Sequence, residues 1–142
     1  MEPRKRVLGL DLGSKTIGLA IGDSGLSIAS PLETIRRKTL AVDFARLAEI
    51  IGERDVGGLV IGLPVNMDGS EGKRCVETRK FAAAFVAKID LPIMFWDERL
   101  STAAVERAMI EADLSRGKRA KIVDKVAAAY ILQGALDFLS RS

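Results

Sequence analysis

The sequence has no histidine, and this absence excludes several kinds of catalytic site at once. Ser-His-Asp triads, Cys-His nucleophiles and His-ligated zinc sites all depend on an imidazole. An enzyme made from this chain therefore has to use carboxylates, lysine, Cys75, Tyr130 or a metal ion held by oxygen atoms. The single cysteine also excludes an internal disulfide framework and is typical of a reducing compartment.

Aromatic side chains and long apolar runs are scarce as well. Aromatic residues make up 5% of the chain, so a base-stacking platform for single strands is not expected. No apolar run approaches the ~20 residues that cross a bilayer, and Asp11 interrupts the first apolar stretch, so we expect neither a membrane span nor a signal peptide. A chain of 142 residues has about the usual length of one domain. We expect a single cytoplasmic domain over residues 1–142, with no membrane partner.

The hydrophobic pattern predicts an α/β fold. Alternation and short apolar runs predict five strands, at residues 6–12, 16–22, 27–36, 58–63 and 92–96. Helical spacing of apolar residues predicts helices at 40–53, 71–89, 102–112 and 122–139, with a basic connection over 115–121. Three strands in an antiparallel meander followed by two helix-connected strands give a five-stranded mixed sheet with helices on both faces.

Acidic residues from distant parts of the chain converge on one edge of this sheet. Asp11 lies on a strand face that otherwise carries small residues, and a stripe of alanines that begins at Asp124 in the last helix would fit against it. Asp97 and Glu98 follow the last strand at the same edge, and alternation does not decide which of the two points inward. Taken singly, each acid also has an ordinary explanation, as a turn residue or as a favourable charge at the start of a helix.

A cluster of carboxylates needs a proton or a cation to be tolerated. Two carboxylates ~4 Å apart repel by ~4 kcal/mol at an effective dielectric constant of ~20. Because the chain offers oxygen ligands and no histidine or cysteine cluster, Mg²⁺ or Mn²⁺ is the expected ion.

Four motifs in order give the chain a specific resemblance. They are Asp11–Gly18 (DLGSKTIG), Gly62–Glu71 (GLPVNMDGSE), Asp97–Thr102 (DERLST) and Lys121–Ala128 (KIVDKVAA). Together they resemble the YqgF family, bacterial proteins with the ribonuclease H-like fold. Members are described as Holliday-junction resolvases and as nucleases that trim the 5′ end of precursor 16S ribosomal RNA.

The resemblance implies a catalytic metal site. Its ligands would be Asp11, one acid of the Asp97-Glu98 pair, with Glu98 the expected metal ligand and either acid a catalytic candidate, and Asp124. Two departures from the pattern stand out. Some members carry arginine where this chain has Thr16, and related resolvases place an acid after the fourth strand, where this chain reads Gly62-Leu63-Pro64.

The implied reaction is phosphodiester hydrolysis, with two metal ions roughly 3.5–4 Å apart at the scissile phosphate. The residues expected to contact the substrate are Lys15, Asn66, Arg99, Ser101, Thr102, Arg116, Lys118, Arg119 and Lys121. The alternative for Lys15 is a solvated turn lysine, and for the basic run a solvated surface. The net charge of +3 permits a nucleic-acid partner without requiring one.

We therefore expect a metal-dependent endonuclease that processes the 5′ end of precursor 16S rRNA. The alternative within the same chemistry is a Holliday-junction resolvase acting on branched DNA. Alternatives from other classes are a non-catalytic ribosome-assembly factor and an actin- or hexokinase-like nucleotide binder, although the latter proteins grip ATP between two domains. The expected partners are precursor rRNA or branched DNA and ribosomal particles, and the expected state is a monomer or a weak homodimer.

Overall fold

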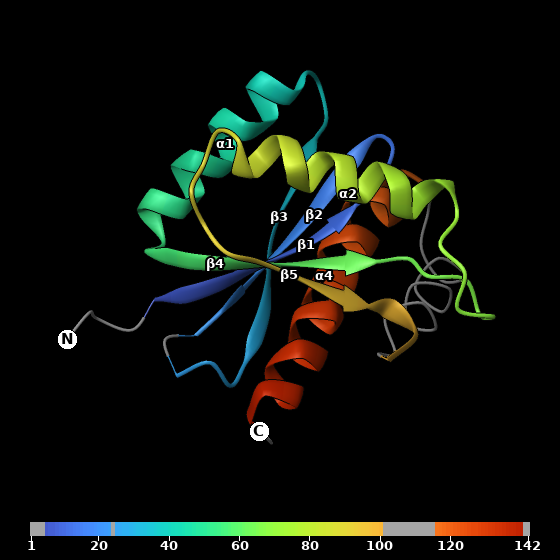
Figure 1. Ribbon diagram of the computed structural model, residues 1–142. Helices are drawn as coiled ribbons and strands as arrows, with labels where there is room; N and C mark the ends of the chain where they lie inside the picture. The colour runs from blue at the N-terminus through green and yellow to red at the C-terminus, as the bar shows by residue number, and fades with distance from the viewer. Residues whose placement is uncertain (1–4, 24, 101–115, 141–142) are drawn as a thin grey trace.

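A five-stranded sheet forms the centre of the molecule (Figure 1). The computed structural model describes residues 5–23, 25–100 and 116–140, with the backbone alone for residues 116–124. In spatial order the strands are β3 (Ala29–Arg36), β2 (Thr16–Gly22), β1 (Arg6–Leu12), β4 (Val56–Leu63) and β5 (Ile93–Asp97). β2 is antiparallel to both of its neighbours, whereas β4 and β5 run parallel to β1. The carboxyl ends of β1, β4 and β5 therefore meet at one edge.

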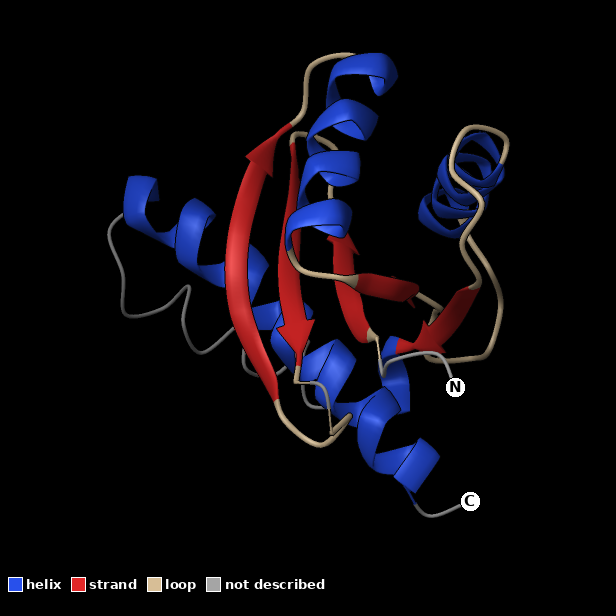
Figure 2. Ribbon diagram, turned by 90° about the vertical axis from the view of Figure 1, so that its left-hand side faces the viewer, coloured by secondary structure: helices blue, strands red, loops and turns tan. Residues whose placement is uncertain are grey.

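Helices cover both faces of the sheet (Figures 1 and 2). α1 (Leu40–Glu53) and α2 (Lys73–Val86) lie on one face, and α4 (Arg116–Ser140) crosses the other. A short 3₁₀ turn, η1 (Glu98–Leu100), follows β5. α1 begins where the Thr39 side chain accepts a hydrogen bond from the Val42 amide at 3.2 Å, which satisfies one of the unpaired donors of the first turn. No helix in the described part of the chain combines the length and apolar character needed to span a bilayer.

Strand alternation separates large from small residues in β1. Leu8, Leu10 and Leu12 point to the side of α1 and α2, where they join the larger core. In that core Phe44 meets the rings of Phe81 and Phe85 edge to face, with centroids 5.3 and 5.6 Å apart. This well-packed side fixes the position of the central strand.

The opposite face of β1 lets α4 approach very closely. A Cβ atom built on Gly9 would lie 2.8 Å from the Cβ of Leu132 and 3.2 Å from the carbonyl oxygen of Ala128. One built on Gly22 would lie 3.5 Å from Leu136, near the start of β1. α4 therefore runs antiparallel to β1, and its first turns lead toward the carboxyl end of that strand.

Replacing Gly9 by alanine is expected to destabilise the fold by about 2 kcal/mol, because the clash involves the base of a side chain and a helix carbonyl rather than a flexible tip. Gly52 in α1 is the matched control, since nothing lies within 4 Å of its Cβ position. Gly52→Ala should stabilise by about 0.5–1 kcal/mol through helix propensity. Urea unfolding of the two variants measures both values, and equal effects would contradict the close contact.

The predicted fold class is confirmed, and the elements outside residues 101–115 appear in the expected order. Where the observed end of a strand or helix differs from the predicted one, the difference is one to three residues. The exception is the start of the last helix, where the prediction was wrong. Residues 116–121 were expected to form a connection, but they are the first turns of α4. Lysine, arginine and alanine are good helix formers, so the single Gly117 does not break the helix. The expected helix at 102–112 lies outside the described residues.

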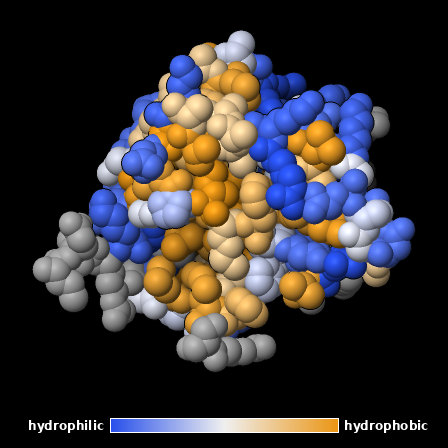
Figure 3. Space-filling view, viewed as in Figure 1, coloured by the Kyte–Doolittle hydropathy of each residue, from blue (hydrophilic) through white to orange (hydrophobic). Residues whose placement is uncertain are grey.

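Polar side chains gather at the edge where the parallel strands end. Figure 3 shows apolar side chains across the middle of the face on which the edge strand β5 lies, and hydrophilic ones toward the end to which β4 and β5 run. Ile93, Met94 and Phe95 of β5 are partly buried against the core. The carboxyl edge is thus where polar chemistry concentrates, as is usual for parallel strands in α/β sheets.

Candidate active site

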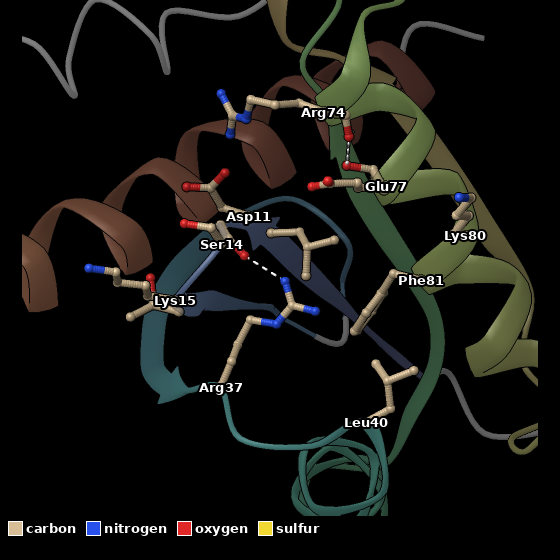
Figure 4. Close-up of a pocket in the computed structure, with 13 residues that line it drawn as sticks. Asp11, Ser14, Lys15, Arg37, Leu40, Arg74, Glu77, Lys80 and Phe81 are labelled. Atoms are coloured by element: carbon tan, nitrogen blue, oxygen red, sulfur yellow. Dashed lines mark hydrogen bonds between the residues drawn. The ribbon is translucent and has the colours of Figure 1, made fainter.

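Asp11 lies at the carboxyl end of the central strand and is only 5% exposed. By alternation it shares the face of Gly9, on which α4 packs. The parallel pairing of β1 with β4 runs to Leu10 and Ile61, so the next residues, Asp11 and Gly62, are neighbours across the two strands. In the close-up its carboxylate points away from Phe81 and Leu40, toward the side of α4 (Figure 4).

Glu98 reaches the same neighbourhood from the end of β5. It is 8% exposed, and its Oε2 atom lies 3.2 Å from the position that a Cβ of Gly62 would occupy. Its Cγ lies 3.3 Å from that position, and Cδ1 of Ile131 in α4 lies 2.6 Å from the same position. Glu98 is therefore on the α4 face, covering the residue beside Asp11. The glycine at the position where related resolvases carry an acid makes room for an acid supplied by the next strand.

Asp97 points elsewhere and is held by Arg99. Its Oδ2 atom accepts from Nη2 of Arg99 at 2.8 Å, and its Oδ1 atom accepts from the Arg99 backbone amide at 2.9 Å. This fork keeps the pKa of the Asp97 carboxyl below its usual range. Arg99 Nη1 also donates to the Met67 carbonyl at 3.4 Å. The pair thus ties η1 to the loop after β4, and fixes the turn from which Glu98 projects.

The loop after β4 closes on itself. The Asn66 side chain donates to the Ser70 hydroxyl at 3.0 Å, and Asp68 accepts from both the Ser70 amide and the Ser70 hydroxyl, at 2.9 and 2.6 Å. These hydrogen bonds lower the pKa of Asp68. Gly69 has a φ of 90°, a conformation that glycine adopts without strain. The amide of Asn66, expected to contact substrate, is therefore engaged within its own loop.

Several of the expected site residues belong to the part of the chain whose side chains are not described. Asp124 and the basic residues Arg116, Lys118, Arg119 and Lys121 lie in the first turns of α4. Asp124 is one helical turn before Ala128, so its backbone lies further toward the carboxyl end of β1 than the Gly9 contact. Ser101 and Thr102 lie outside the described residues.

The two described carboxylates suit a hard divalent cation. Asp11 and Glu98 are both buried, and the missing side chain of Gly62 lets Glu98 lie close against the strand on the face of α4. Oxygen donors of this kind match Mg²⁺ or Mn²⁺. Within the described residues no group of three acidic or sulfur ligands is found, and the side chain of Asp124, the expected third ligand, lies outside them. Cys75 is fully buried and burial raises the pKa of its thiol, which makes it a packing residue.

A pocket of about 690 Å³ adjoins Asp11 on the side of α2 (Figure 4). Lys15, an expected substrate contact, is exposed in the turn between β1 and β2 and lines this pocket. Three further cations line it that the sequence pattern did not single out, namely Arg37, Arg74 and Lys80. A signal for one of them was present: Arg74, Thr78 and Phe81 follow helical spacing, so Arg74 lies on the stripe of α2 that faces the sheet.

Comparisons with known proteins agree with this architecture. A family model described as "RuvX: Holliday junction resolvase" matches residues 5–138. A protein of Roseobacter denitrificans named "Putative pre-16S rRNA nuclease" is 60% identical over 135 residues, which cover 94% of this chain and 83% of the relative. A Rhodospirillum rubrum protein of the same name is 54% identical over 142 residues, covering 99% of this chain and 88% of the relative.

Two solved structures share the fold at low sequence identity. RuvC of T. thermophilus, in complex with a Holliday junction substrate, superposes with a TM-score of 0.59 at 13% identity and 96% coverage of each chain. The yeast mitochondrial resolvase Ydc2 gives a TM-score of 0.54 at 12% identity, covering 99% of this chain and 81% of the other. These likenesses confirm the expected ribonuclease H-like fold.

Proposed function

Because the chain belongs to the RuvX family, which is the YqgF family named above, we propose that it is a metal-dependent endonuclease that trims the 5′ end of precursor 16S rRNA. The observation that carries the proposal is the burial of Asp11 and Glu98 on one face, with Glu98 packed against Gly62, the neighbour of Asp11 across the two strands. Two buried carboxylates that reach the same end of the sheet are oxygen donors of the kind that hold a divalent cation, which supports the proposal. We propose that the protein acts in the cytoplasm, on rRNA or on ribosomal particles, as a monomer or weak homodimer.

The chain's own residues would perform distinct parts of the reaction. Asp11, Glu98 and Asp124 would hold Mg²⁺ or Mn²⁺, which supplies Lewis acidity toward the phosphate and activates water when bound. The Asp97–Arg99 fork holds the turn that carries Glu98, so this carboxylate stays oriented before substrate arrives. Lys15, exposed beside Asp11, would offset the negative charge of the incoming phosphate.

A Holliday-junction resolvase is the second candidate, and the description of the family model favours it. Resolution of a four-way junction requires two cuts, and therefore two active sites held together in a dimer. Trimming of an RNA end requires one cut. The names of the curated relatives support the RNA substrate.

The experiment that tests the proposal offers purified protein a precursor 16S rRNA leader and a four-way DNA junction, each with Mg²⁺, with Mn²⁺ and with a chelator. We expect cleavage of the RNA at a defined 5′ position with either metal, and loss of cleavage by about a thousandfold when the metal is removed. Chelator-resistant cleavage would contradict the metal site. Paired symmetrical cuts in the junction, without RNA cleavage, would favour the resolvase.

A further inference from the structure

The pocket beside Asp11 opens on the opposite side of the sheet end from Glu98. Its floor is apolar, formed by Leu12, Leu40 and Phe81 on the side of α1 and α2. Its rim carries the cations Lys15, Arg37, Arg74 and Lys80, and the carboxylates Asp11 and Glu77. Figure 4 shows these groups arranged around one cavity between the β1–β2 turn and α2. One wall of the candidate active site is therefore also one wall of the pocket.

Three of the rim cations are available to a ligand. Lys15, Arg74 and Lys80 are exposed, and within the described part of the chain no carboxylate forms an ion pair with any of them. Arg79, also on α2 but outside the pocket lining, is by contrast paired with Glu71 through two hydrogen bonds of 2.7 and 2.8 Å. Unpaired positive charge on this helix thus concentrates at the cavity.

Arg37 has a different part in the pocket. Its Nη1 atom donates to the Gly13 carbonyl at 2.7 Å, and its guanidinium lies over the Phe81 ring, 5.7 Å from the ring centroid. These contacts join the turn that carries Lys15 to α2, which carries Arg74 and Lys80. Arg37 therefore holds the two cationic walls in a fixed relation, so a phosphate that enters finds donors already placed.

The volume of the pocket limits what can occupy it. About 690 Å³ lies in the range of sites that enclose one small ligand, roughly 300–1,000 Å³. One nucleotide of a single strand fits such a space, whereas a stacked base pair within a duplex cannot enter it. The apolar floor suits the sugar or base of that nucleotide, and the cationic rim suits its phosphate.

We propose that this pocket binds one unpaired nucleotide of the substrate strand, next to the phosphate that is cleaved, through Lys15, Arg74 and Lys80. The strand then crosses the end of β1 from the Glu98 side to the α2 side. This inference rests on the proposed nuclease function and adds to it a requirement that the substrate be single-stranded beside the cleavage site.

The test measures binding rather than cleavage, in a protein that carries Asp11→Asn to prevent turnover. The probe is a fluorescein-labelled single-stranded RNA of about 16 nucleotides, compared with a blunt-ended RNA duplex of the same length. Arg74→Ala/Lys80→Ala is compared with Arg54→Ala/Lys88→Ala, in which two exposed cations near the far ends of α1 and α2 are removed. Both variants lose the same charge, and thermal unfolding checks that both remain folded.

For the single strand, we expect the pocket variant to bind about tenfold more weakly at low salt. Its slope of log affinity against log salt should fall by about 1.4, because each lost phosphate contact removes about 0.7. The control variant should change the slope far less, and the blunt-ended duplex should show no difference between the two variants. Equal slopes for the two variants on the single strand would overturn the inference, as would a loss of affinity by the pocket variant on the blunt-ended duplex equal to its loss on the single strand.

The outcome is separable from that of the proposed function. If the unmodified protein cleaves no RNA but the slope difference appears, the pocket stands and the nuclease proposal fails. If the protein cleaves RNA with Mg²⁺ and the two variants bind alike, the nuclease proposal stands and the pocket inference fails.

Discussion

Asp11→Asn is expected to lower metal-dependent cleavage by about a thousandfold while the protein stays folded. The asparagine keeps the shape of a side chain that is 5% exposed, but it removes the negative charge that a divalent ion requires. Single-turnover cleavage of the labelled RNA leader measures the loss. Asp90→Asn is the matched control, because Asp90 is exposed in the connection between α2 and β5 and should keep full activity.

Thermal unfolding of the same variant, with and without Mg²⁺, provides a second and independent test. An ion that binds the folded state raises the melting temperature, by more when it binds more tightly, so Mg²⁺ should stabilise the unmodified protein and the Asp90 variant. Asp11→Asn should lose this stabilisation. Metal stabilisation that survives Asp11→Asn would place the ion elsewhere.

Glu98→Gln is expected to reduce cleavage by about a hundredfold, and Asp97→Asn by much less. Only Glu98 lies on the face of Asp11, over Gly62, whereas Asp97 is bound to Arg99. Rate constants at saturating metal compare the two variants directly. A larger loss in Asp97→Asn than in Glu98→Gln would reverse the assignment of the acid.

Asp97 should instead be visible in the pH dependence of stability. Its pKa is lowered by the Arg99 hydrogen bonds, so its carboxylate stabilises the fold above its unfolded pKa of about 3.9. That contribution is lost as pH falls below this value toward the lowered folded pKa. Asp97→Asn should therefore lower the free energy of unfolding at neutral pH and flatten its decrease in acid, as measured by urea unfolding.

Much of the fold could be predicted because β1 and β2 alternate so regularly. Large residues on one face and glycine or alanine on the other identify which side a helix can approach closely, and Gly9 against Ala128 is that contact. The choice between Asp97 and Glu98 could not be made in this way. Alternation ends with β5 at Asp97, and Glu98 begins a 3₁₀ turn whose side-chain directions do not follow period two.

The pocket could not be predicted from the sequence either, for a different reason. Its cations come from the β1–β2 turn, the segment before α1, and α2, and each of them separately resembles an ordinary solvated charge. Tertiary contacts bring these segments together, among them those of Arg37 with Gly13 and with Phe81. The basic run before Asp124 was predicted wrongly for another reason. Its charges were interpreted as a connection between helices, but lysine, arginine and alanine also favour a helix, and these residues form the first turns of α4.

The close contact of α4 with β1 also restricts how this protein can vary. Because backbone atoms and the bases of side chains touch at Gly9, the gap between helix and strand is set by atoms that cannot rotate away. Any larger residue there would lift the helix that carries Asp124 relative to the strand that carries Asp11. A substitution at this contact between α4 and β1 that changes stability is therefore expected to change catalysis too. Residues at this contact should accept substitutions more slowly during evolution than those on the leucine-rich side of β1.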